Sequence, residues 1–273
     1  MIKCLELFSG TKSVGKVCDQ LGWESVSVDL IMDADHKCDI MDFDYKQYDK
    51  DEFDIIWASP PCTNYSALKK CWYGRKLKNG IVYTKELNEI DQNEADVLVL
   101  KTLEIINYFD CKYWFMENPQ TGNLKNREIM KGIPFYDVDY CMYSDWGYKK
   151  RTRIWTNKED WENKLCDNSG SCGNMITIPN KKQHSKVLAN GYEMINGEKV
   201  VCNTKEKRDA FRKLHQTNCG NTEKIQAVRK HLKGIGIGAD SIAKGQIMVA
   251  GSGTNRLERY RIPEDLIFSL FLD

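Results

Sequence analysis

The sequence lacks any long run of apolar residues. A membrane-spanning helix needs about 18 or more in succession, and no stretch of this chain approaches that length. The chain begins with Met1-Ile2-Lys3, which leads directly into a candidate strand and not into the charged and apolar regions of a signal peptide. We therefore expect neither a membrane span nor a secretory signal.

Net charge is also nearly absent. Lysine and arginine total 40 against 39 aspartates and glutamates, so the net charge of +1 by itself gives no support for a nucleic-acid partner. Eleven cysteines are present, but their spacing is irregular, and an odd number cannot all pair within one chain. This pattern excludes the disulfide framework of a secreted protein and favours a reducing cytoplasm.

The first part of the chain alternates between strand and helix patterns. Short apolar runs predict strands, and apolar residues at helical spacing predict helices between them. The expected strands cover residues 3–8, 26–30, 53–58 and 113–116, and the expected helices cover residues 14–21 and 95–106. In a chain of 273 residues this alternation predicts an α/β fold, with a mostly parallel sheet and helices on both faces.

The pattern changes after Thr156. Residues 157–200 are polar with weak periodicity, and residues 205–233 hold nine basic residues against three acidic ones. The last residues predict a short helix with a proline and two acids in its first turn, and we expect this helix to pack back on the first domain. The expected domain boundaries are 1–156, 157–255 and 256–273.

A glycine-containing turn follows the first predicted strand. Phe8-Ser9-Gly10, with Gly15 after it, would let a ligand approach the backbone at the start of a helix. The spacing matches neither the dinucleotide-binding fingerprint nor a phosphate-binding loop. Asp29 ends the next strand, where an acid commonly accepts hydrogen bonds from ribose hydroxyls, and Asp39 follows later in the chain. A neutral or cationic nucleoside therefore fits better than a polyphosphate, with solvated surface acids as the alternative.

A cysteine follows the third predicted strand. Pro60 and Pro61 restrict the backbone before Cys62, at the carboxyl edge where open α/β sheets bind ligands. A thiolate is a soft nucleophile suited to attack on an electron-poor ring carbon. Cys62 is therefore a candidate nucleophile, whereas cysteines inside predicted strands and helices are interpreted as core residues.

Two further charged groups lie next to strands. Glu117 ends an apolar run and precedes a turn with Pro119, and a buried carboxylate is costly unless it is paired or functional. Arg151 and Arg153 alternate at the start of a strand, which places both guanidinium groups on one face. A basic surface stripe is the alternative interpretation of these arginines.

Taken in order, these motifs resemble the DNA (cytosine-5)-methyltransferase family, especially its compact phage and viral members. Pro61-Cys62-Thr63-Asn64-Tyr65-Ser66 is similar to the family's Pro-Cys-Gln-x-Phe-Ser motif. Glu117-Asn118-Pro119 resembles its Glu-Asn-Val motif, and residues 149–153 resemble its Gln-x-Arg-x-Arg motif with lysine in place of glutamine. The resemblance covers residues 3–157 and, weakly, the last residues of the chain.

The resemblance implies a Rossmann-like, S-adenosylmethionine-dependent methyltransferase domain with a small target-recognition domain at 157–255. Cys62 would attack C6 of a cytosine flipped out of double-stranded DNA, and Glu117 would contact N3. The methyl group of S-adenosylmethionine would then pass to C5. Arg153 would orient the base, and Arg151 would help to position the site.

The same motifs imply the remaining site residues. The implied cofactor-binding residues are Phe8, Ser9, Gly10, Gly15, Asp29, Leu30, Asp39, Ile40, Ser59 and Pro60. The implied substrate-binding residues are Ser66, Asn118 and Lys149. Residues 67–85, rich in basic and aromatic side chains, suit a loop that closes over the DNA backbone. We expect a monomer in the cytoplasm of a bacterial host or a virus-infected cell.

The region after residue 157 is less informative. Its basic run can contact phosphates but does not specify a sequence. Cys166, Cys172, His184 and Cys202 are residue types that bind zinc, yet their spacing matches no compact zinc motif, so we assign no metal site. The family's Gly-Asn-Ser-Val motif is absent, and residues 259–263 are the candidate replacement. This departure leaves open whether the cofactor is ordinary or modified S-adenosylmethionine.

Three alternative functions stay open. A tRNA cytosine-5 methyltransferase shares the Ser-Pro-Pro-Cys form of residues 59–62, although such enzymes carry a Cys-Phe-Thr tripeptide that this chain lacks. A catalytically silent nucleic-acid-binding module would not need Cys62, Glu117 and Arg153 together. The third alternative is transfer of a modified group from an altered cofactor.

Overall fold

The computed structural model describes residues 1–77, 79–178, 181–184, 194–195, 198–199 and 260–272. The chain divides into two compact units. The first comprises Met1–Tyr143, Lys150–Leu165 and Ile262–Asp273, and the second comprises Ser144–Lys149 and Cys166–Arg261. The basic run at 205–233 and Cys202 lie outside the described residues, and the domain boundaries expected from the sequence stay predictions.

Strands and helices alternate through the first unit, as the sequence predicts. The described strands are β1 (Lys3–Leu7), β2 (Glu24–Val28), β3 (Ile55–Ala58), β4 (Tyr113–Pro119), β5 (Phe135–Asp139), β6 (Arg151–Thr156), β7 (Met175–Ile178), β8 (Lys181–His184), β9 (Met194–Ile195) and β10 (Glu198–Lys199). The described α-helices are α1 (Ser13–Leu21), α2 (Lys85–Tyr108) and α7 (Glu264–Leu272). Short 3-10 helices are η1 (Tyr45–Gln47), η2 (Thr63–Tyr65), η3 (Ala67–Trp72), η4 (Leu124–Asn126), η5 (Glu128–Met130) and η6 (Tyr140–Met142). None of the helices in the described ranges is both long and apolar enough to span a membrane.

A six-stranded sheet in the order β2-β1-β3-β4-β6-β5 forms the centre of the first unit. The pairings among β1, β2, β3 and β4 are parallel, whereas β6 runs antiparallel to its two neighbours, β4 and β5. The predicted α/β class and the mostly parallel sheet are therefore confirmed, and the architecture is Rossmann-like. In such a sheet the carboxyl ends of neighbouring parallel strands meet at one edge, which is where ligands bind.

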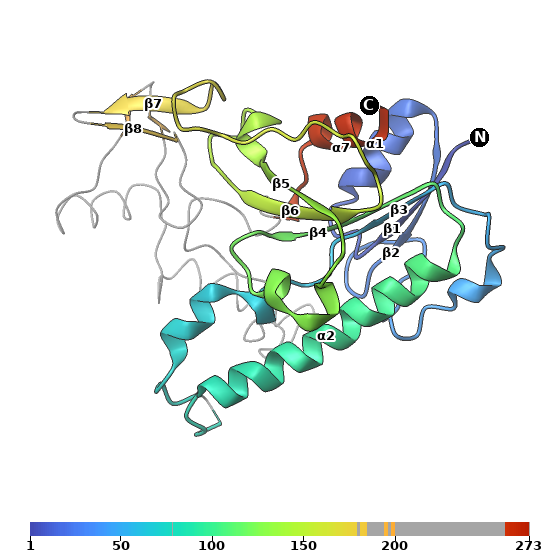
Figure 1. Ribbon diagram of the computed structural model, residues 1–273, viewed down its shortest axis with the longest axis horizontal. Coiled ribbons are helices and arrows are strands. Elements are labelled where there is room, and N and C mark those ends of the chain that lie inside the picture. Colours follow the sequence, from blue (N-terminus) through green and yellow to red (C-terminus); the bar gives the residue numbers. More distant parts are fainter. Residues whose placement is uncertain (78, 179–180, 185–193, 196–197, 200–259, 273) are drawn as a thin grey trace, which may run out of the picture. The chain divides into compact units, whose positions relative to one another are not determined.

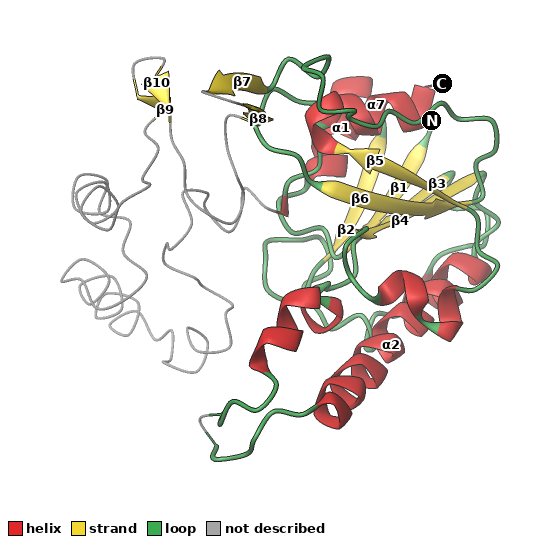
Figure 2. Ribbon diagram, turned by 60° about the vertical axis from the view of Figure 1, so that its left-hand side comes forward, coloured by secondary structure: helices red, strands yellow, loops and turns green. Residues whose placement is uncertain are grey.

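Helices cover both faces of the sheet, with α1 and α7 on one face and α2 on the other (Figures 1 and 2). The side chains of Ala95 and Val99 in α2 belong to the main hydrophobic core. On the opposite face, the Phe271 ring of α7 packs against Trp57 and Phe115. All four residues of β3 are buried, as expected for a strand covered on both sides.

The sequence patterns of two elements, β5 and the first part of α2, do not clearly predict the strand and the helix that the structure shows. β5 carries polar residues such as Asp137 and Asp139, so its apolar alternation is obscured, but it pairs along its whole length with β6. The helix α2 begins at Lys85, well before the apolar stripe, because the Thr84 hydroxyl accepts a hydrogen bond from the Leu87 N–H at 3.2 Å. Its first turns bury polar side chains, which hide the helical periodicity from the sequence.

The predicted C-terminal helix is present as α7. Glu264 and Asp265 occupy its first turn, where acids favour a helix start. Gln20 of α1 donates a hydrogen bond to Glu264 at 3.2 Å, and the Ile262 N–H donates to the Ser13 hydroxyl at 3.2 Å. These contacts hold α7 beside α1.

A buried carboxylate on β1 caps α1. Glu6 is 2% exposed, and its two oxygens accept the backbone N–H groups of Val14 and Gly15 at 3.1 and 3.0 Å. Lys12, at the N-cap position, provides no side-chain cap, so Glu6 satisfies these donors instead. Desolvation raises the pKa of Glu6 to about 7, although the two backbone hydrogen bonds oppose the shift.

This carboxyl group makes stability depend on pH. Because the folded-state pKa of about 7 lies above the ordinary value of 4.5, stability is fully present below about pH 4.5 and falls as the pH rises through 7. We expect wild type to lose about 2 to 3 kcal/mol more unfolding free energy than Glu6→Gln in urea titrations from about pH 5 to pH 8, because the amide does not titrate. An equal pH dependence in both proteins would contradict this assignment.

Candidate active site

The turn after β1 has a strained backbone. Phe8, Gly10 and Lys12 have φ angles of 57°, 52° and 53°, in the left-handed region that bulky side chains rarely adopt. The turn is held by hydrogen bonds from the Lys12 N–H to the Ser9 carbonyl at 2.8 Å and from the Ser9 N–H to the Val28 carbonyl at 3.1 Å. Strain maintained by surrounding structure is typical of ligand-binding turns.

Asp29 connects this turn to the end of β2. Its Oδ2 accepts the Gly10 N–H at 2.9 Å, and its Oδ1 accepts the N–H groups of Ile31 and Met32, both at 2.8 Å. Each carboxylate oxygen can accept a second hydrogen bond, so Oδ2 retains capacity for a ribose hydroxyl. Leu30 is 55% exposed beside it. Asp29 is therefore a fixed acceptor and not a freely solvated acid.

The residues around this turn fit a nucleoside ligand. Ser9 is buried, and its hydroxyl has no hydrogen-bond partner within the described part of the chain. Burial of an unpaired hydroxyl costs free energy unless a ligand forms a hydrogen bond with it. A Cβ at Gly15 would lie 3.3 Å from the Ser25 hydroxyl, so glycine is what allows α1 to approach the strands this closely. Both observations are compatible with the S-adenosylmethionine that the sequence resemblance implies.

The other implied cofactor residues lie in the loops that follow β2 and β3. The Asp39 carboxylate accepts the Met41 N–H at 2.9 Å, and Ile40 is buried in the main core. The Ser59 N–H donates to the Leu7 carbonyl at 3.2 Å and extends the pairing between β1 and β3. Their contacts with a cofactor stay predictions.

Cys62 lies in a turn that the next strand holds in place. The buried side chain of Asn118, at the end of β4, donates from Nδ2 to the Pro60 carbonyl at 2.9 Å. β3 and β4 are parallel neighbours in the sheet, so the chain segments that carry Cys62 and Glu117 emerge at the same edge. The second amide atom, Asn118 Oδ1, is buried without a partner among the described residues, which suits a further contact with substrate.

The helix α2 anchors the segment after Cys62. The Tyr65 hydroxyl donates to Asp96 at 2.8 Å, and Lys69 pairs with Asp91 at 2.5 Å. Arg127 forms a second ion pair with Asp96, at 2.6 Å. Although desolvation opposes it, hydrogen bonds from Lys69 and Tyr83 lower the pKa of Asp91. Lys69 is thus a buried anchor rather than a surface cation of the loop at 67–85.

Glu117 is held by two side chains that the sequence patterns did not indicate. Its Oε1 accepts the Tyr140 hydroxyl at 2.8 Å and lies 3.2 Å from Lys150 Nζ. The Lys150 ammonium also lies 4.5 Å from the centre of the Tyr140 ring. These contacts satisfy a carboxyl group that is only 7% exposed. Lys150 directly precedes the predicted Arg151, but the sequence does not show which of the adjacent residues Lys149 and Lys150 contacts Glu117.

The two predicted arginines pair with acids on β5. Arg153 contacts both oxygens of Asp137, at 2.7 and 2.9 Å, and its guanidinium lies 3.5 Å from the centre of the Phe135 ring. Arg151 is more exposed and lies 3.8 Å from Asp139. The register places each arginine opposite its acid, so the pairs alternate along one face of β5 and β6.

The remaining predicted substrate residues have structural partners. The Ser66 hydroxyl accepts the Leu68 N–H at 3.3 Å and caps η3. Lys149 donates to the Cys166 carbonyl at 2.7 Å within the second unit. The amine beside Glu117 is therefore that of Lys150, and direct substrate contacts of Ser66 and Lys149 stay predictions.

Comparison with known proteins gives an extensive sequence match to a viral protein. No protein-family model matches the chain. A protein of Frog virus 3 (isolate Goorha) described as "Probable DNA (cytosine-5)-methyltransferase" is 43% identical over 190 residues, which cover 69% of this chain and 86% of the viral protein.

Solved methyltransferase structures are similar over little more than half of their own length. The S. pombe Dnmt2 methyltransferase has a TM-score of 0.37 and 11% identity, covering 60% of this chain and 51% of that one. The Entamoeba histolytica methyltransferase EhMeth has a TM-score of 0.40 and 14% identity, covering 61% and 56%. On the identity and coverage of the viral relative, the chain belongs to the DNA (cytosine-5)-methyltransferase family, whose methyl donor is S-adenosylmethionine.

Proposed function

We propose that this protein methylates C5 of a cytosine flipped out of double-stranded DNA, through a covalent adduct between Cys62 and C6. The observation that carries the proposal is the 2.9 Å hydrogen bond from Asn118 to the Pro60 carbonyl. It joins the turn that presents Cys62 to the strand that presents Glu117. A nucleophile and a carboxyl group on neighbouring strand ends are what addition to the cytosine ring requires.

Cys62 and Glu117 divide the chemistry between them. The Cys62 thiolate forms the S–C6 bond while the electrons of the C5–C6 double bond move toward C5. Glu117 supplies a proton to N3, so the adduct is held as an enamine. Lys150 and Tyr140 orient the carboxyl group through Oε1, and we assign Oε2 to the base. When bound, S-adenosylmethionine would supply the methyl group for C5 and would leave as S-adenosylhomocysteine. Return of the N3 proton to Glu117, loss of the C5 proton to water and departure of the Cys62 thiolate then restore the ring.

Arg153 orients the base in this proposal. Its guanidinium is already held on two sides, by the Asp137 carboxylate and by the face of Phe135. Little side-chain freedom is therefore lost when substrate binds. Arg151, with 58% of its side chain exposed, is more accessible to a nucleotide and helps to position the site.

The segment after Cys62 supports a nucleic-acid partner. Lys70, Arg75 and Lys76 are exposed, and Trp72 is 45% exposed among them. Cations next to an exposed aromatic ring can contact phosphates and stack on a base. We propose that the enzyme acts as a monomer on DNA in the reducing cytoplasm of a bacterial host or a virus-infected cell.

Methyl transfer from labelled S-adenosylmethionine tests the substrate. We expect label in duplex DNA and not in tRNA, and Cys62→Ala should lower the rate by at least about 1,000-fold because the covalent step is lost. Cys111→Ala, just before the start of β4, is the matched control and should retain activity. Label in tRNA alone would show that tRNA, and not DNA, is the substrate. Label in neither polymer would refute the enzyme assignment.

Duplex DNA with 5-fluorocytosine at the target position tests the nucleophile. The C5 fluorine cannot leave as a proton does, so the S–C6 bond should persist and peptide mass spectrometry should locate it at Cys62. Cys111 offers little thiolate, because burial raises its pKa to about 11. An adduct on any other cysteine would contradict the assignment of Cys62.

Replacement of Asn118 tests the contact that carries the proposal. Asn118→Asp keeps the shape but removes the donor to the Pro60 carbonyl, so the Cys62 turn loses its support. We expect kcat to fall by about 10-fold, from the loss of roughly 1.4 kcal/mol, with little change in S-adenosylmethionine affinity. Asn126→Asp makes the same chemical change at an exposed amide and should have no effect. An unchanged kcat in Asn118→Asp would show that this hydrogen bond does not position the nucleophile.

A further inference from the structure

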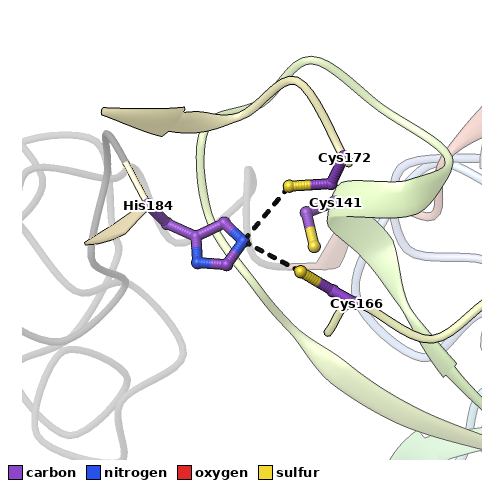
Figure 3. Close-up of side chains that lie close together, drawn as sticks. All are labelled: Cys141, Cys166, Cys172 and His184. Carbon is purple, nitrogen blue, oxygen red and sulfur yellow. Dashed lines mark hydrogen bonds between the residues drawn. The ribbon is translucent and has the colours of Figure 1, made fainter. Parts of the chain in front are cut away.

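Four side chains of metal-binding types lie close together in the structure. The donor atoms of Cys141, Cys166, Cys172 and His184 all lie within 4.8 Å of one another. Figure 3 shows the sulfur atoms and the imidazole ring directed toward one another. The proposed methyl transfer uses none of these residues.

The distances around His184 fit a shared metal ion. Its Nε2 lies 3.6 Å from Cys166 Sγ and 3.6 Å from Cys172 Sγ. Two ligands at ordinary zinc bond lengths, in tetrahedral geometry, place sulfur and nitrogen roughly 3.6 Å apart. The contacts therefore have the spacing of atoms around one ion.

The loop between the two cysteines is ordered by its own backbone and side chains. Asn168 and Gly170 have φ angles of 64° and 113°, and the Gly173 N–H donates to the Gly170 carbonyl at 3.0 Å. The Asp167 carboxylate accepts the Ser169 N–H at 2.8 Å. This conformation brings both ends of the loop, and so both thiols, back to one place.

Further hydrogen bonds hold the backbone of the candidate ligands Cys166 and Cys172. The buried Asn174 side chain donates to the Cys172 carbonyl at 2.9 Å and to the Ser144 carbonyl at 2.7 Å. Lys149 donates to the Cys166 carbonyl at 2.7 Å. His184 ends β8, where it pairs with Met175, the residue after Asn174. Outer contacts of this kind orient metal ligands and support their affinity.

The donor set selects the kind of metal. Three sulfur atoms and one imidazole nitrogen suit Zn²⁺, and the absence of oxygen donors from the group disfavours Mg²⁺ and Ca²⁺. Cys141 and Cys166 are 1% and 6% exposed, so their thiolates would need a compensating positive charge. Four protein ligands leave no open coordination position, which is typical of a structural and not a catalytic ion.

We propose that Cys141, Cys166, Cys172 and His184 bind one structural Zn²⁺ ion, which holds the Cys166–Cys172 loop and the end of β8 together. The sequence patterns do not group Cys141 with the candidate zinc ligands, and only the structure brings it beside them. Cys202, which was among those candidates, lies outside the described residues.

Metal analysis of the full chain tests the site. Protein purified without chelators should contain one zinc ion per chain by mass spectrometry of the metal. Replacement by Co²⁺ after chelation should give the thiolate charge-transfer and tetrahedral d–d absorption bands of a cysteine-rich site. Cys172→Ser and His184→Ala should each weaken zinc binding by more than about 100-fold, because loss of a ligand exceeds the effect of losing an outer contact.

Two further variants separate ligand loss from misfolding. Cys172→His retains a donor and should still bind Co²⁺, with weaker thiolate bands, whereas Cys71→Ser changes an exposed thiol outside the group and should leave the metal content unchanged. Wild-type protein that binds neither Zn²⁺ nor Co²⁺ would overturn the proposal. Full zinc retention in both ligand-loss variants, or a disulfide between two of the three thiols, would also overturn it.

Discussion

The arrangement of the site depends on one buried hydrogen bond, from the Asn118 amide to the Pro60 carbonyl. Pro60 and Pro61 have no N–H groups, so the turn before Cys62 lacks the backbone donors that anchor most turns. A side chain from the neighbouring strand fixes it instead. Because β3 and β4 are parallel, this contact couples the candidate nucleophile to the strand that carries Glu117, and sheet pairing sets the spacing of the two.

Polar side chains in the first half of α2 hold the segment that follows Cys62. Asp91 and Asp96 face Lys69, Tyr65 and Arg127, and so tie the segment after Cys62 to a long, regular helix. These residues would be costly to bury singly, but each has a charged or hydroxyl partner. Helix α2 thus has two functions along its length: its first turns bind the loop by polar contacts, and its later turns pack in the core.

The cysteines of the chain occupy three physical environments. Cys4 and Cys18 are fully buried among apolar residues, and the pKa of Cys4 is raised mainly by the contact with Cys18 and by burial, so it behaves as a core residue. Cys62 is half-buried in a turn at the ligand-binding edge of the sheet. Cys166 and Cys172 lie against an imidazole nitrogen. The neighbours of each cysteine therefore decide whether it is assigned to the core, to the proposed reaction or to the proposed metal site.

The sequence by itself determined the α/β class and the order of the motifs, and it nominated Cys62, Glu117 and the two arginines as candidate site residues, because apolar periodicity and proline or glycine at strand ends are local signals. Only the tertiary structure decided that Lys150 and Tyr140 contact Glu117, that Lys69 is buried, that β5 completes the sheet, and that Cys141 lies beside Cys166, Cys172 and His184. Each of these depends on residues distant along the chain meeting through strand register and helix packing, and no local pattern encodes such meetings.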